Sequence, residues 1–187
     1  MTERQIYNNL KKEWKNVSSD FIEEYKNWYI DMQKWVDENR PEKYTLIQAC
    51  GIFSCLSVMK SVEENKRLFL SFCKGGRSGH FKKQIDKCVL ISKMPDIRVK
   101  QANSIIKGDK TVSFFNNLYN PKNPRYVCND RHVIKLSYKG ENRNITPKRY
   151  EIISNAIKKL SREVGMIPNQ TQAVIWGISK KLYGNDI

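Results

Sequence analysis

The apolar residues along most of the chain recur at intervals of three and four, which is the period of an amphipathic α-helix. Residues 3–15 place Ile6, Leu10 and Trp14 on one helical face, and residues 44–59 form the most apolar stretch, which predicts a central core helix. No segment shows a convincing alternation of apolar and polar residues that would predict a strand. The pattern therefore predicts an all-α fold, a multi-helix orthogonal bundle.

Capping residues and breaks at Pro and Gly divide this pattern into separate helices. Ser61 with Glu64 three residues later marks one helix start, and Thr146 followed by Pro147 marks another, which Gly165 ends. Further helices are expected at residues 81–93, 96–106, 110–119, 131–137, 147–164 and 168–183.

An aromatic stripe distinguishes the helix that is expected to begin near Asp20, with Glu23 as its capping-box partner, and to end before Pro41. Its large side chains stand at helical spacing: Phe21, Tyr25, Trp28, Met32 and Trp35. Such a stripe serves either as core or as a platform for a ligand. We favour packing into the core, since large aromatic residues dominate core energetics.

The charge is unevenly distributed, because residues 1–42 sum to −2 and residues 43–187 to +17. We therefore expect an acidic amphipathic helical extension over residues 1–42 and a basic domain over residues 43–187. A positive field of this size attracts polyanions, of which nucleic acid is the usual soluble one. An anionic membrane surface and a merely solvated lysine-rich surface are the alternatives.

The cysteines, the histidines and the polar N-terminal residues indicate the cellular compartment and whether a cofactor is expected. Five cysteines, with no C-x-x-C pair, lie mostly in apolar runs and favour reduced core residues in a cytosolic protein; they are Cys50, Cys55, Cys73, Cys88 and Cys128. With two histidines and no ligand spacing, we expect no metal and no cofactor. The polar residues 1–14 lack a secretory h-region and no apolar stretch is long enough to span a bilayer, which predicts a soluble cytoplasmic protein.

A tight basic connection is the first candidate for chemistry. The helices expected at 96–106 and 110–119 are joined only by Lys107, Gly108 and Asp109. A hairpin of this kind aims the free amides of its second helix at a phosphate, and the helix dipole adds to the attraction. It contacts the backbone of DNA and reads no sequence.

Two short strings carry a resemblance to a known family. The chain has Gly108-Asp109-Lys110-Thr111 and then Asn129-Asp130-Arg131-His132-Val133, which resembles the hairpin and the Asp-x-His of the helix-hairpin-helix DNA glycosylase superfamily. The resemblance covers roughly residues 44–140. Residues 145–176 are similar to an uncharacterised, often phage-borne group that shares these strings. The chain departs from the family where Ile106 replaces the first hairpin glycine, and it lacks the family's cysteine cluster.

The resemblance implies that residues 43–187 form a glycosylase-like domain that removes a modified or damaged base from DNA after flipping its nucleotide out of the duplex. Asp130 would stabilise positive charge on the sugar and help activate a nucleophile. Lys110, partly desolvated at a helix start, would attack the sugar carbon and permit strand cleavage; otherwise water would act. His132 would support the Asp130 turn through a hydrogen bond.

The DNA itself is expected to meet a set of loop and helix-start residues. These are Lys74, Arg77, His80, Lys107, Gly108, Thr111, Arg125 and Arg131. The glycine-rich loop over residues 74–80 matches no phosphate-binding fingerprint, and a plain interhelical loop is the simpler interpretation. The expected partner is double-stranded DNA, the expected setting a bacterium or phage-infected cell, and a monomer is slightly favoured.

Other functions remain open on the same residues. A nucleic-acid-binding regulator, viral or not, would keep the fold without the chemistry, because a fold does not determine a function. A transferase that modifies a base in DNA would use Asp130 and need no lysine nucleophile. A protein of the membrane surface comes last, since the helices look packed against one another.

Overall fold

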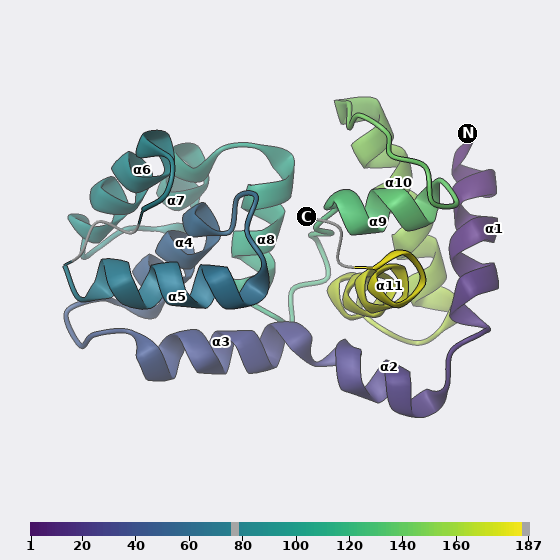
Figure 1. Ribbon diagram of the computed structural model, residues 1–187, viewed down its shortest axis with the longest axis horizontal. Coiled ribbons are helices and arrows are strands. Elements are labelled where there is room, and N and C mark those ends of the chain that lie inside the picture. Colours follow the sequence, from purple (N-terminus) through teal and green to yellow (C-terminus); the bar gives the residue numbers. More distant parts are fainter. Residues whose placement is uncertain (76–78, 185–187) are drawn as a thin grey trace. The chain divides into compact units, whose positions relative to one another are not determined.

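Every regular element of the described chain is an α-helix, which confirms the all-α class. The computed structural model describes residues 1–75 and 79–184. Its helices are α1 (Glu3–Trp14), α2 (Ser19–Lys26), α3 (Trp28–Asn39), α4 (Leu46–Leu56), α5 (Val62–Cys73), α6 (Lys82–Ser92), α7 (Val99–Ile106), α8 (Asp109–Tyr119), α9 (Arg131–Ser137), α10 (Pro147–Glu163) and α11 (Pro168–Tyr183) (Figure 1). Within these described residues, no helix is long and apolar enough to cross a membrane.

The chain folds into two compact units that are interleaved in sequence. Unit 1 contains residues 1–29 together with the chain from residue 121, and unit 2 contains residues 30–120. This division differs from the expected extension over residues 1–42. The reason is that α1 and α2 bury their apolar faces in the core of unit 1, against helices more than a hundred residues later.

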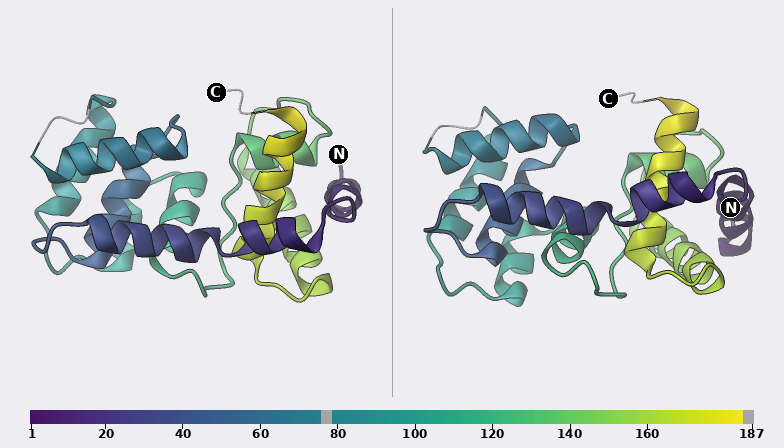
Figure 2. Two further views of the ribbon diagram at one scale, coloured as in Figure 1. Left: turned by 60° about the horizontal axis from the view of Figure 1, so that its bottom comes forward. Right: turned by 90° about the horizontal axis from the view of Figure 1, so that it is seen from below.

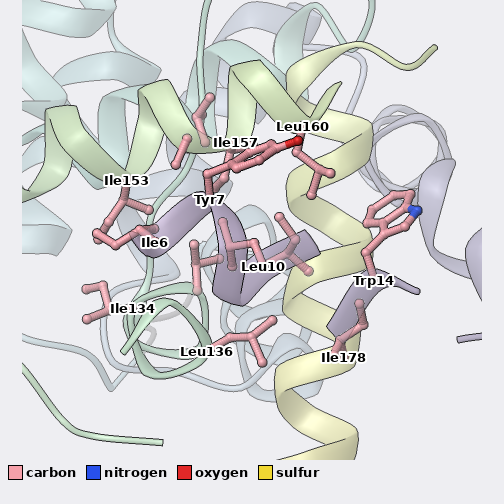
Figure 3. Packing of buried hydrophobic residues seen from close by; sticks show 14 of the residues in the cluster. Ile6, Tyr7, Leu10, Trp14, Ile134, Leu136, Ile153, Ile157, Leu160 and Ile178 are labelled. Atoms are coloured by element: carbon pink, nitrogen blue, oxygen red, sulfur yellow. The ribbon is translucent and has the colours of Figure 1, made fainter. Parts of the chain in front are cut away.

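In unit 1, α1 packs along α10, and both contact α11. Ile6 and Leu10 of α1 are fully buried, and Figure 3 shows them facing Ile153, Ile157 and other aliphatic side chains of α9, α10 and α11. Each of these four buried residues contributes about 1.5–3 kcal/mol of transfer free energy. The apolar face predicted for residues 3–15 is therefore the face that is buried.

The aromatic helix expected from Asp20 onward is two helices. Ser18 caps α2 by accepting a hydrogen bond from the Phe21 N–H at 3.3 Å, so the capping box at Asp20 was wrong. The helix ends at Lys26, and α3 begins at Trp28. In unit 1, α2 packs on α11, where the ring of Tyr25 lies against the backbone of Gly177.

Unit 2 is built around α4, which contacts α5, α6, α7 and α8 (Figure 2). Its core holds three fully buried rings, Phe53, Phe69 and Phe115, and Trp35 of α3 lies 5.9 Å from Phe53 between ring centroids. The packing interpretation of the aromatic stripe is thus confirmed for Trp35. Of the five cysteines, Cys73 is half-buried and the others are buried, as expected of core residues.

Several helix ends lie where the capping residues predict them. The Ser61 hydroxyl accepts the Glu64 N–H at 3.2 Å, and the Thr146 hydroxyl accepts the Arg149 N–H at 3.3 Å. Gly165 follows α10 with φ +69, the left-handed conformation that commonly ends a helix. The apolar helix expected over residues 44–59 is shorter, because α4 ends at Leu56.

Candidate functional site

The connection between α7 and α8 in unit 2 has an unusual backbone. Only two residues separate the helices, Lys107 with φ +56 and ψ 156, and Gly108 with φ +82. The Lys107 conformation belongs to a region that is almost reserved for glycine, and holding another residue there costs about 1–3 kcal/mol. The chain therefore bends on a strained lysine and one glycine.

Neighbouring side chains hold this strained connection in place. The ammonium of Lys87 on α6 donates a hydrogen bond to the carbonyl of Ile106, the last residue of α7. The Lys107 N–H donates to the Asn103 carbonyl at 3.1 Å, and the Asn116 side-chain amide donates to the Asn103 side chain at 2.9 Å. Strain that persists at a surface connection needs such support, and it is often found at binding or catalytic positions.

The first turn of α8 follows directly from this bend. Its N-cap is Gly108, which has no side chain to accept the first N–H groups of the helix. Lys107 and Lys110 are exposed beside it, whereas Thr111 is half-buried. Asp109 adds a negative charge to the same turn. The exposure of Lys110 differs from the partial desolvation that the sequence led us to expect of a nucleophilic amine.

In unit 1, Asp130 is the N-cap of α9 and is half-buried. Its carboxylate accepts the Val133 N–H at 3.0 Å. A carboxylate at this position also lies at the positive end of the helix dipole, which stabilises the helix. The turn is therefore held by Asp130 itself.

The residues before Asp130 are fastened to α10. The side-chain amide of Asn129, 1% exposed, donates to the Tyr150 carbonyl at 3.0 Å and to the Ser154 hydroxyl at 2.8 Å. The Tyr150 hydroxyl in turn donates to the Val127 carbonyl at 2.7 Å. These bonds fix the backbone that presents Asp130, and nothing in the sequence around Tyr150 indicated this role.

His132 does not support the turn in the expected way, because no hydrogen bond joins it to Asp130 in the described part of the chain. Its half-buried ring instead stands edge-on to Trp176 of α11, with ring centroids 6.2 Å apart. Burial lowers the pKa of His132, and this effect outweighs the opposing influence of Asp130. The neutral imidazole is thus the favoured form.

Trp176 is the centre of a half-buried group of rings in unit 1, which we name the aromatic cluster: Tyr25, Trp28, His132 and Trp176. The centroid of Trp28 lies 5.9 Å from that of Trp176, and the Lys180 ammonium lies 4.4 Å above the Trp176 ring. Neither Trp176 nor Lys180 is among the functional residues predicted from the sequence. The available signal was an aromatic and a lysine four residues apart on one helix.

The remaining predicted DNA contacts are divided between the units. Lys74 is exposed just after α5 in unit 2, whereas Arg125 and Arg131 are exposed in unit 1. Arg77 lies outside the described residues. His80 in unit 2 is half-buried, its Nε2 has no hydrogen-bond partner, and burial lowers its pKa.

Positive charge belongs to both units. Unit 1 carries eighteen basic and ten acidic side chains, and unit 2 carries sixteen and nine. The acidic residues of positions 1–42 are thus divided between units 1 and 2, each of which has a net positive charge. Among the described residues, no group of three or more His, Cys, Asp or Glu side chains is arranged to hold a metal ion.

Comparison with known proteins gives one match. A family of unknown function, DUF7178, matches residues 1–182 of the chain. No curated protein and no solved structure matches it.

Proposed function

Since the chain belongs to DUF7178, whose function is unknown, we propose from its own residues that it binds double-stranded DNA and hydrolyses the bond between a base and its sugar. The observation that carries this proposal is the placement of Asp130. It is a half-buried carboxylate at the start of a helix, on a backbone fastened to α10, and two residues from a histidine packed on Trp176.

DNA binding is supported by the charge of both units and by the α7–α8 connection. We take this connection to be the helix-hairpin-helix element of the protein. The start of α8, whose N-cap Gly108 has no side chain, lies beside the exposed Lys107 and Lys110, and a helix start with such cations suits a backbone phosphate. Contacts of this kind position a duplex without selecting its sequence.

Base removal is supported by the chemistry that Asp130 and the aromatic cluster offer. A base can be attacked only after its nucleotide has rotated out of the stack, and flat aromatic side chains compensate part of the lost stacking. As the bond from C1′ to the base nitrogen breaks, positive charge grows on the sugar, and a fixed carboxylate stabilises it. A water oxygen then bonds to C1′, and the water's proton leaves with the base.

Lys110 has two proposed roles that differ in their product. As a phosphate contact it leaves an abasic site behind, and its exposure in the structure favours this role. As a nucleophile it forms a Schiff base with the sugar, which leads to strand cleavage. Borohydride reduction traps only the second kind of intermediate.

A second candidate function is DNA binding without chemistry. It is favoured by the hydrogen bond from the Val133 N–H to Asp130, since capping α9 is by itself a sufficient reason for an aspartate at this position. The two candidates differ in whether a base is released, and therefore in whether the negative charge of Asp130 is needed.

Asparagine at position 130 separates charge from capping, because it caps helices about as well as aspartate. We would compare wild type, Asp130→Asn, Asp130→Ala and Lys110→Ala on labelled duplexes that contain one methylated, oxidised or deaminated nucleotide, and use an abasic duplex for borohydride trapping. Base release is read by alkaline strand cleavage and DNA binding by fluorescence anisotropy. We expect release from at least one duplex, and at least a 100-fold slower rate for Asp130→Asn at unchanged DNA affinity.

Two results would contradict the proposal in different ways. Full activity of Asp130→Asn would remove Asp130 from the chemistry. Wild-type protein that binds every duplex, releases no base and forms no borohydride adduct would establish the binding function instead. An adduct that Lys110→Ala abolishes would assign the nucleophile to Lys110.

A further inference from the structure

A cavity of about 330 Å³ lies in unit 1, lined by residues of the loop after α9 and of the start of α10. None of the residues assigned to base removal lines it. Its lining combines three cations, Arg143, Lys148 and Arg149, with apolar surface from Met1, Tyr138 and Ile152. Its volume is within the range of small-molecule sites and exceeds what a single inorganic anion fills.

The electrostatics of the cavity favour an anion. Arg143 is partly neutralised by Glu141, since its Nε lies 2.9 Å from a Glu141 carboxylate oxygen. Within the described part of the chain, Lys148 and Arg149 form no ion pair, and Arg149 donates one hydrogen bond to the Asn144 carbonyl at 2.7 Å. Two cations of the cavity lining are therefore without an acidic partner among the described residues.

The start of α10 adds to this positive potential. Thr146 lines the cavity and caps the helix by accepting the Arg149 N–H. Pro147 has no N–H, so Lys148 supplies the next N–H of the first turn, together with its ammonium group. Guanidinium groups and helix N–H groups form a combination that suits the oxygens of a phosphate.

We propose that this cavity binds a nucleoside phosphate, with its phosphate on Lys148 and Arg149 and its sugar or base against Tyr138 and Ile152. The ligand is either a free mononucleotide or the 5′-phosphorylated end of a DNA strand. The inference does not rest on the proposed base removal, because Asp130 has no part in the cavity. It adds a second place at which unit 1 receives nucleotide chemistry.

The test uses the full chain and isothermal titration with adenosine 5′-monophosphate, adenosine and inorganic phosphate. The cavity variant is Lys148→Gln with Arg149→Gln, and the matched control is Lys158→Gln with Arg162→Gln on the same helix. The control removes the same charge about 15 Å or more along α10, beyond the screening length of about 8–10 Å. Lys148→Gln alone is also measured, because it leaves the hydrogen bond from Arg149 to the Asn144 carbonyl intact. Circular dichroism checks that each variant is folded.

We expect the monophosphate to bind wild type, the cavity variant to bind at least 10-fold more weakly, and the control to change affinity less than 2-fold. Adenosine should bind too weakly to measure, and inorganic phosphate more weakly than the monophosphate. Equal losses of affinity in both double variants would mean that the effect depends only on the net charge of the protein, and would overturn the proposed site. Inorganic phosphate that binds as tightly as the monophosphate would overturn the assignment to a nucleotide.

A second pair of ligands distinguishes the two sources of the phosphate. If strand ends are bound, a 5′-phosphorylated oligonucleotide should bind at least 5-fold more tightly than its 5′-hydroxyl form, and the cavity variant should abolish this preference. If neither the monophosphate nor the 5′-phosphate is preferred by wild type, the proposal is wrong. Asp130→Asn should leave all of these affinities unchanged, so that failure here is distinguishable from failure of the proposed function.

Discussion

The contact between Gly177 and Tyr25 decides whether Gly177→Ala stabilises or destabilises the protein. A Cβ added at Gly177 would lie 2.6–2.8 Å from three ring carbons of Tyr25. The optimal separation of two carbons is about 3.5–4.0 Å, so each of the three contacts falls short by about 1 Å. The ring belongs to α2, which packs on α11, and it lies against the rings of Phe21 and Trp176.

Two effects oppose each other in Gly177→Ala. Alanine favours the interior of a helix over glycine by about 1 kcal/mol. Overpacking of a well-packed site costs about 1–3 kcal/mol. We expect overpacking to prevail, with a net loss of about 1 kcal/mol in the free energy of unfolding. In a Tyr25→Ala background the ring is absent, and Gly177→Ala should instead stabilise the protein by up to about 1 kcal/mol.

The assay is urea unfolding followed by tryptophan fluorescence, for all four combinations of the two substitutions. Gly51→Ala in unit 2 is the control, because its added Cβ would contact Ile91 at 3.2 Å and has no contact with Tyr25. Its effect should be the same in both backgrounds. Stabilisation by Gly177→Ala in the wild-type background, or an equal effect in both, would refute the proposed packing of Tyr25.

Three further predictions concern the candidate sites. Lys107→Gly should raise the free energy of unfolding by about 1 kcal/mol because it relieves the conformation at φ +56, and it should weaken DNA binding measured by anisotropy; a loss of stability would contradict the strain. Thr146→Ala should lower stability by about 0.5–2 kcal/mol through loss of the α10 cap, seen as a lower urea midpoint. Burial lowers the pKa of His132, so the unfolded chain takes up a proton first as the pH falls through about 6.5, and stability is lost below that pH. His132→Gln should therefore lose less stability than wild type between pH 7.5 and 5.5, and an identical loss in both proteins would contradict this.

Helix position and helix ends could be read from the sequence wherever the cause is local. Ser61 and Thr146 accept hydrogen bonds from N–H groups three residues later, and Gly165 follows α10 in the left-handed conformation, so all three are found in the roles expected of them. The break of the aromatic stripe at Asn27 was missed, because an unbroken helical period gives no sign of a change of direction.

The candidate sites could be predicted only in part. Asp130 and a tight basic bend after Ile106 were visible, because each depends on neighbours in the chain. The predicted bend also included Asp109, which is instead the first residue of α8. The fastening of Asn129 by Tyr150 and Ser154, and the packing of His132 on Trp176, join residues about 20 to 45 positions apart. Such contacts depend on which helix faces meet, and the period of one helix does not specify its partner.

The sequence by itself determined the helical class, the buried face of α1 and the excess of positive charge, because periodicity and composition are properties of the chain alone. Tertiary structure decided that α1 and α2 complete the core of unit 1, so that two basic units replace one acidic extension and one basic domain. It also formed the cavity at Lys148 and Arg149. The physical reason is that an apolar face requires burial but accepts any complementary face, and only the folded chain selects one.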